Sequence, residues 1–316
     1  MRVELDPLSC NGSDALHPLL MLLGVFTDER HEWAADEPAI AALATYFEGY
    51  APTVAPAVRS LGQKAIVNAA WSAGPGPAPV RVTRADLPNL AHDLSRPAVL
   101  IVEDLVNDGA FVRAVAAVFG SRRVLTALAN QWLEFRHAGG TGRFPAVVEA
   151  ELAGFRTLAR IALLADSDRW MPGQVTKIHR KAADFRAAGL SVHVLELREA
   201  ENYLPHRVLA ACGSPSTASA TLTALKKLSP DQRGHYDMKN GFGRRAEPAK
   251  IRPEQQALFD GLDPHIRDAL RGGFGDGLLP VFERHCARVK VADIAALGAH
   301  VEADLRALLS TIESVI

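Results

Sequence analysis

The chain of 316 residues is long enough for two or three domains, and with 48% hydrophobic and 22% charged residues it has the composition of a globular protein rather than a disordered one. Its formal net charge of −1 excludes a polycation, so any contact with nucleic acid has to come from a local basic patch. The cysteines are isolated in the sequence, which excludes a CxxC zinc site and a dense disulfide framework and favours a reducing cytoplasm.

Residues 1–96 are expected to form a mostly helical N-terminal region. Ser13 is suited to cap a helix that runs to about Phe26. A second helix is predicted over 37–50, where apolar residues recur at spacings of three and four. We find no signal-peptide pattern, and the apolar stretch 18–26 is too short to span a bilayer. No association with a membrane is therefore expected.

A central domain is expected over 97–212. The continuous apolar run Ala98–Val102 is typical of a strand that is covered on both faces. Asn107 or Asp108 is expected to cap the helix that follows, and Gly120 is expected to end it. The domain therefore begins with a strand and a helix in direct succession.

Strand and helix patterns then alternate to the end of this domain. They comprise a strand at either Val124–Leu128 or Trp132–Arg136, a glycine loop at 139–142, a helix over 145–158, a strand at Ile161–Ala165, a basic helix over 174–188 and a strand at Val192–Leu197. The alternation predicts an α/β fold with a parallel sheet and helices on both faces. In such sheets the ligand site lies beyond the C-terminal ends of the strands.

The C-terminal region, 213–316, is expected to be helical again. Its segment 221–252 contains eight Lys or Arg against three Asp or Glu. A charge run of this kind is usually a solvated face. The functional alternative is phosphate binding, for which the candidates are Lys226, Lys227, Arg244 and Arg245.

Acids gather at the predicted ends of three strands. The candidates are Glu103, Asp108, Asp166, Asp168, Glu199 and Glu201. One acid after a strand is usually a helix cap or a loop charge, but clustered carboxylates repel one another and need a cation or protons. Hard divalent cations prefer carboxylate oxygens, and two of them can clamp the attacking and leaving oxygens of a phosphodiester. The pattern therefore predicts a site for Mg²⁺ or Mn²⁺.

The stretch IVEDLVNDGAF (101–111), followed by LLADSD (163–168), resembles the Toprim domain of topoisomerases, primases and nucleases of the OLD (overcoming lysogenization defect) family. Glu103 matches the family's strand-end glutamate, and Asp166 and Asp168 match its DxD motif. Asp108 matches the second acid, although the spacing is one residue longer than usual and Asp104 replaces a glycine. The resemblance covers about residues 97–205, including the glycine loop, and implies that Glu103, Asp166 and Asp168 are catalytic metal ligands.

The segment AENYLP (200–205) resembles the Glu-Asn-Tyr segment of OLD-like nucleases and of their stand-alone relatives in phage-defence operons. The resemblance implies that Glu201 is a metal ligand, and Glu199 is an alternative supply of oxygens. Lys239 is a candidate stabiliser of transition-state charge by analogy with the catalytic lysine of OLD proteins, although no motif aligns it.

The sequence lacks two features of Toprim proteins, and each absence excludes one function. No Walker motif is present, so the ATPase that OLD proteins carry is absent, and the cysteines exclude the zinc module of a primase. The resemblance therefore implies a nuclease that acts on DNA or RNA as an anti-phage effector, alone or with a separate ATPase partner protein. It leaves assembly into a homo-oligomer open.

Two other hypotheses remain. A phosphorylation-switched receiver domain is suggested by LIVED (100–104) and DRWMPG (168–173). Against it, Glu103 and Asp168 lie 65 residues apart, the glycine loop has no receiver equivalent, and no lysine follows the third strand at a suitable place. The other hypothesis is a catalytically silent Toprim scaffold that binds nucleic acid or a partner.

Overall fold

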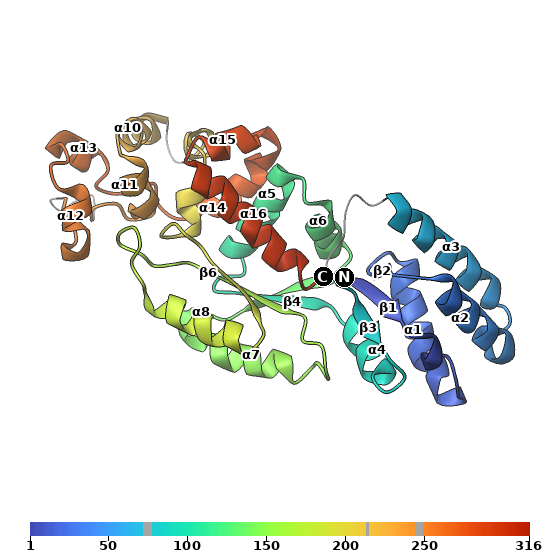
Figure 1. Ribbon diagram of the computed structural model, residues 1–316. Coiled ribbons are helices and arrows are strands. Elements are labelled where there is room, and N and C mark those ends of the chain that lie inside the picture. Colours follow the sequence, from blue (N-terminus) through green and yellow to red (C-terminus); the bar gives the residue numbers. More distant parts are fainter. Residues whose placement is uncertain (72–77, 213–214, 244–248) are drawn as a thin grey trace.

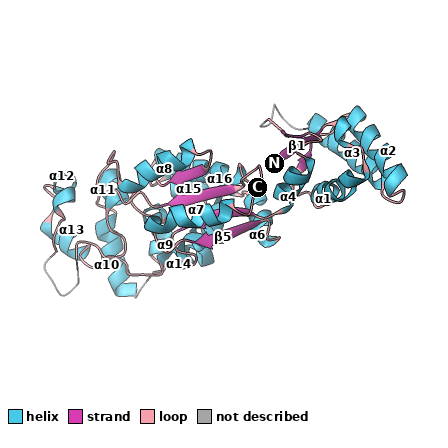
Figure 2. Cartoon of the chain, turned by 90° about the horizontal axis from the view of Figure 1, so that it is seen from below, coloured by secondary structure: helices cyan, strands magenta, loops and turns pink. Residues whose placement is uncertain are grey.

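Helices flank two parallel β-sheets, one of three and one of four strands, so the α/β class expected from the sequence is confirmed. The computed structural model describes residues 1–71, 78–212, 215–243 and 249–316, without the side chains of 215–218. The N-terminal region lies at one end of the four-stranded sheet and helices of the C-terminal region lie at the other end (Figures 1 and 2).

The central sheet consists of parallel strands in the order β5 (Leu133–His137), β4 (Ala98–Val102), β6 (Ile161–Ala165) and β7 (Ser191–Val194). β4 and β6 are buried along their whole length, as their continuous apolar sequences predict. Alternate residues of β4 face opposite sides, because Leu100 and Val102 join one core cluster and Val99 and Ile101 join the other. The sheet therefore has a helical layer on each face.

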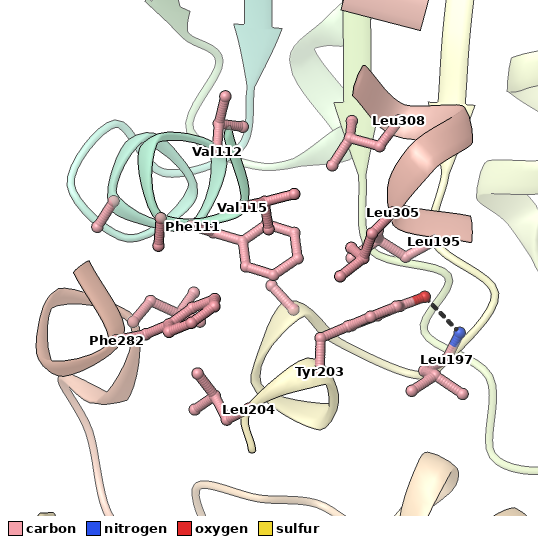
Figure 3. Close-up of a cluster of buried hydrophobic side chains, with 14 of the residues drawn as sticks. Phe111, Val112, Val115, Leu195, Leu197, Tyr203, Leu204, Phe282, Leu305 and Leu308 are labelled. Carbon is pink, nitrogen blue, oxygen red and sulfur yellow. Dashed lines mark hydrogen bonds between the residues drawn. The ribbon is translucent and has the colours of Figure 1, made fainter. Parts of the chain in front are cut away.

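One face of this sheet is covered by α7 (Phe144–Leu152) and α8 (Lys177–Ala187), which contribute Phe144 and Ile178 to the smaller cluster. The other face is covered by α5 (Asn107–Phe119), α6 (Arg122–Ala129) and α16 (Ala299–Glu313), and α14 (Leu278–His285) packs on α5. Figure 3 shows the centre of this larger cluster, where Phe111, Tyr203 and Phe282 meet. This face of the sheet is therefore packed by helices of the central domain together with helices of the C-terminal region.

The N-terminal region contains its own parallel sheet, in the order β2 (Glu32–Trp33), β1 (Arg2–Leu5) and β3 (Val80–Val82). Its helices are α1 (Leu16–Thr27), α2 (Glu37–Tyr50), α3 (Ala55–Trp71) and α4 (Leu87–Ser95). The two helices predicted in this region are confirmed, but the three-stranded sheet is not predicted from the sequence. Strands of two to four residues are too short to give a periodic signal.

The C-terminal region is helical in its described residues, as expected. Its remaining helices are α10 (Pro215–Leu225), α11 (Pro230–His235), α12 (Gln256–Phe259), α13 (Pro264–Ala269) and α15 (Val291–Ala295), and the short helix α9 (His206–Leu209) precedes it at the end of the central domain. Tyr236 and Met238 are fully buried and Phe242 nearly so, so these three residues of the basic segment 221–252 belong to the core.

Three local predictions are settled by the structure. The strand after α5 is β5, and Val124–Leu128 lies in α6. The start of α5 is capped by neither of the expected residues: the Asp104 carboxylate accepts from the amides of Val106 and Asn107, at 2.8 Å each. Ser13 lies in a short 3₁₀ turn before α1, and the N-cap position of α1 is occupied by Ala15 instead.

Within the described part of the chain, no helix combines the length and apolar character that a membrane crossing needs. The longest apolar helix near the N-terminus, α1, has twelve residues and packs in the N-terminal core.

Candidate functional site

The candidate site lies where the order of the central sheet reverses. From β4 the chain goes first to β5 on one side and then to β6 on the other side, so a crevice is expected between the carboxyl ends of β4 and β6. Glu103 directly follows β4 and Asp166 directly follows β6. Because Ile101 pairs with Leu163, the two acids leave the sheet at the same edge.

Glu103 is a partly buried carboxyl group in an acidic environment. Burial raises its pKa to about 7, and repulsion from Asp168 and Asp108 adds to the shift, against the opposing effect of the Thr141 and Asp166 amides. Its Oε1 is buried and has no hydrogen-bond donor among the described residues. The predicted glycine loop lies beside it, because the amide of Gly139 donates to the Glu103 carbonyl oxygen at 3.1 Å.

Asp108 fixes the turn that carries Glu103. Its Oδ2 accepts from the main-chain amides of Glu103 and Asp104, at 3.0 and 2.9 Å. Burial raises its pKa in spite of these two donors. Asp108 therefore orients the end of β4, and it contributes its charge to the same acidic environment.

Asp166 is the centre of the acidic group. Its pKa is raised well above the ordinary value, first by burial and then by four neighbouring carboxylates, those of Glu201, Asp108, Glu199 and Glu103. Its Oδ1 accepts from the amide of Ala200 at 2.9 Å, so the end of β6 is tied to the segment after β7.

Asp168 is exposed and has a left-handed backbone, with φ of +54°. Such a conformation is uncommon for a residue with a side chain, although Asp and Asn adopt it more readily than most residues. The amide of Asp168 donates to the carbonyl oxygen of Arg198 at 3.1 Å, and the Ser167 hydroxyl donates to that of Leu197 at 2.6 Å. These two hydrogen bonds join the segment after β6 to the segment after β7, in addition to the bond between Asp166 and Ala200.

The segment after β7 brings two more acids to this edge. Glu199 and Glu201 are only 7% and 4% exposed, as expected of groups that point inward. Asn202, which is fully buried, holds the segment: its side-chain oxygen accepts from the Glu199 amide and its nitrogen donates to the carbonyl oxygens of Arg233 and Tyr236. The strand itself is shorter than expected and ends at Val194.

Lys239 comes from the C-terminal region and lies between these two acids. Its Nζ is 3.4 Å from Glu199 Oε2 and 3.2 Å from Glu201 Oε1. Burial alone lowers the pKa of Lys239, but Glu201, Glu199 and Asp166 outweigh it and raise the pKa above the ordinary value. Lys239, which no sequence motif aligns with the family, is therefore a counter-ion of Glu199 and Glu201.

Each of the six predicted acids thus lies close enough to repel at least one other, and we call them the acidic edge: Glu103, Asp108, Asp166, Asp168, Glu199 and Glu201. In the described chain, however, no three His, Cys, Asp or Glu side chains are grouped closely enough to hold one metal ion as they stand. The convergence on a single cation that the sequence predicts is therefore not present in this arrangement, in which Lys239 pairs with two of the acids.

Two of the four predicted phosphate-binding residues lie in the described part of the chain. Lys226 and Lys227 are exposed directly after α10, where they are free to meet a solvent-borne ligand. Arg244 and Arg245 lie outside the described residues.

Sequence reasoning missed Arg198. Its Nη2 is 3.0 Å from Glu199 Oε1, and its guanidinium lies 3.5 Å from the centre of the Trp170 ring, with Arg252 on the same ring at 4.5 Å. Only its position next to Glu199 in the sequence hinted at a charge pair. Because Arg198 pairs with Glu199 and lies over Trp170, the stack is next to the acidic edge.

Comparisons with protein-family models, with curated proteins and with solved structures find no match. The function is therefore argued from the site itself.

Proposed function

We propose that this protein is a metal-dependent nuclease that hydrolyses phosphodiester bonds of DNA or RNA at the acidic edge. The observation that carries the proposal is the placement of six carboxylates at the topological switch point of a parallel sheet, where burial and mutual repulsion raise the pKa of Asp166, Glu103 and Glu201. Such a cluster is costly to maintain unless cations neutralise it in the working state.

The residues fit a divalent cation chemically. Two buried carboxylate oxygens, Glu103 Oε1 and Glu201 Oε2, have no hydrogen-bond donor among the described residues, and Glu199 Oε2 has only the ion pair with Lys239 Nζ at 3.4 Å. Unpaired carboxylate oxygens are the ligands that Mg²⁺ and Mn²⁺ prefer. Asp166 and Glu103, at the ends of adjacent strands, would hold the ion together with Asp168 and Glu201. Bound there, the ion would supply a Lewis acid for the phosphoryl oxygens.

Lys239 has a separate role in this proposal. In the absence of a cation its ammonium group compensates Glu199 and Glu201. Once these carboxylates are neutralised otherwise, the ammonium is released to contact a phosphate oxygen and to stabilise the charge that develops there.

Lys226 and Lys227, which are exposed, are the proposed contacts to the nucleic-acid backbone. A role in anti-phage defence, with a separate ATPase partner, rests on the Toprim resemblance alone.

The proposal is tested by cleavage assays on plasmid DNA and single-stranded RNA with Mg²⁺, Mn²⁺ or a chelator. The informative variant is Asp166→Asn, which keeps the size of the side chain and removes its charge. We expect cleavage only with metal, and a loss of about 100-fold or more in the variant, comparable to removing one group that stabilises a transition state.

Glu149→Gln is the matched control, because Glu149 is an exposed acid on α7 that takes no part in the acidic edge. Both variants are checked for unchanged circular dichroism. Cleavage by Asp166→Asn at the wild-type rate, or cleavage that survives chelation, contradicts the proposal.

The receiver hypothesis keeps one supporting observation. The strand order β5-β4-β6-β7 is the order 2-1-3-4 in chain numbering, which receivers share in their flavodoxin-like sheet. Incubation with a small phosphodonor followed by mass spectrometry decides the matter. Phosphate on Asp168, together with absence of metal-dependent cleavage, favours the receiver hypothesis over the nuclease.

A further inference from the structure

A second chemically distinct site lies at the opposite edge of the central sheet. A pocket of about 780 Å³ is lined by the N-terminal region and by residues that precede the strands, including Trp132 before β5 and Arg160 before β6. In Figure 1 the N-terminal region adjoins this edge of the sheet. Asp166 of the acidic edge follows β6, so β6 separates the two sites.

The pocket is rich in guanidinium groups. Five arginines line it: Arg2, Arg30, Arg122, Arg123 and Arg160. Arg160 is only 1% exposed, and its Nε and Nη1 donate to the carbonyl oxygens of Val315 and Arg96 at 2.8 and 2.7 Å. Its Nη2 has no hydrogen-bond partner in the described part of the chain.

Arg30 is in a similar state. Its Nη1 donates to the carbonyl oxygen of Ser95 at 2.7 Å, while its Nε and Nη2 are buried and lack a partner among the residues described. Burial lowers the pKa of Arg160 to about 9, and the charges of Arg30 and Arg123 add to this effect. Buried guanidinium groups that lack an acidic partner and repel one another are stabilised by a bound anion.

The acids of the pocket do not supply that anion, because most of them are engaged elsewhere. Glu29 pairs with Lys64 at 2.5 Å, and Glu313 accepts from the Ser121 hydroxyl at 2.6 Å. Glu32 lies 3.4 Å from Arg2 Nε, and Asp28 is exposed at the end of α1. The Ile316 oxygen accepts from Arg123 Nη2 at 2.7 Å and from the Met1 amino group at 2.6 Å, so it is engaged by groups other than Arg30 and Arg160. The unpartnered nitrogens of Arg30 and Arg160 therefore stay without a carboxylate.

We propose that this pocket binds a nucleoside di- or triphosphate through Arg30, Arg123 and Arg160. The planar guanidinium fork matches two phosphate oxygens at once, which a point charge does not. The volume lies within the range of small-molecule sites, and Trp132, Val80 and Ala127 offer an apolar and aromatic lining for the base. The proposal does not depend on the nuclease activity at the other edge.

The test is calorimetric titration of the full chain with ATP, GTP, inorganic pyrophosphate and citrate. Chelator is present throughout, so that metal-bridged binding at the acidic edge is excluded. We expect binding of the nucleotides. We also expect Arg30→Gln and Arg123→Gln each to weaken it roughly 10- to 100-fold, the effect of losing a hydrogen bond to a charged group.

Arg59→Gln is the control, because Arg59 is an exposed arginine on α3 that pairs with Glu48 and does not line the pocket. Arg160 itself is left intact because it also holds the main chain. The proposal is overturned if no nucleotide binds at millimolar concentration, if citrate binds as tightly as the nucleotides, or if Arg59→Gln weakens binding as much as the pocket variants.

Discussion

At the scale of single residues, burial and neighbouring carboxylates raise the pKa of Glu103, Asp166 and Glu201 in the acidic edge. Glu103 and Asp166 leave adjacent strands, and each is surrounded by further carboxylates, whereas the basic partners Lys239 and Arg198 pair with other acids of the group. Lys239 contacts Glu199 and Glu201 rather than Glu103. The charged form of Glu103 is thus stabilised chiefly by main-chain amides, and its titration is a sensitive probe of the site.

The raised pKa of Glu103 predicts how stability depends on pH when no divalent cation is present. Its ordinary pKa is 4.5 and its folded value is about 7, so the folded state binds the proton more tightly than the unfolded state. This contribution to the free energy of unfolding is fully present below pH 4.5 and is lost as the pH rises through 7. It amounts to about 3 kcal/mol at most.

Urea unfolding at pH 5 and pH 8, in the presence of chelator, measures this effect. Wild type is expected to lose stability between the two pH values. Glu103→Gln should lose less, because the amide does not titrate, while Asp166 and Glu201 still contribute in the same direction. Glu149→Gln should behave as wild type. Equal losses in wild type and Glu103→Gln would mean that the pKa of Glu103 is not raised in the folded state.

At the scale of elements, the position of Glu199 and Glu201 depends on the buried tyrosine that follows them. The hydroxyl group of Tyr203 donates to Asp304 of α16 and accepts from the amide of Leu197 at 3.0 Å (Figure 3). Its ring packs against Phe111 of α5 with centroids 5.7 Å apart. The last helix and the helix after β4 are therefore joined through the segment that carries the two acids.

Tyr203→Phe removes the hydroxyl group and keeps the ring. The Leu197 amide and one oxygen of Asp304 then lose a buried partner, which should lower the free energy of unfolding by roughly 1–3 kcal/mol. Tyr50→Phe is the control, because Tyr50 is about half exposed. Urea unfolding checks the prediction, and a change in Tyr203→Phe no larger than that in Tyr50→Phe would show that the bridge contributes little.

The elements also show how far sequence reasoning reaches. β4, β6 and α2 are predicted because each is long or continuously apolar, and the acids after β4 and β6 follow from parallel-sheet geometry. β1, β2 and β3 are missed because two to four residues carry no period. The cap of α5 is misassigned because several polar residues in succession could serve.

The electrostatic partners are the least predictable part of the site. Lys239 reaches Glu199 and Glu201 from 38 or more residues away in the sequence, and only the packing of the 198–202 segment against Arg233 and Tyr236 brings it there. The arginine pocket was not foreseen at all, since its members come from the N-terminal region, α6 and the start of β6. Sequence spacing gives no sign of such contacts.

At the scale of the whole molecule, the central sheet has a negative and a positive end. The acidic edge lies beyond the carboxyl ends of β4 and β6, and the arginine pocket lies before the amino ends of β5 and β6. Arg160 and Asp166 stand on either side of β6, a buried strand of five residues. A strand of this length spans roughly 17 Å, so the two sites are separate but share a rigid element.

Anomalous scattering from crystals soaked in Mn²⁺ shows whether the acidic edge binds divalent cations. We expect at least one peak between Glu103 and Asp166, with carboxylate oxygens at about 2.1 Å, and Lys239 moved away from Glu199 or Glu201. The same soak of Asp166→Asn should lose or weaken the peak. Fully occupied manganese elsewhere on the protein, with none at the acidic edge of the wild type, would contradict the account.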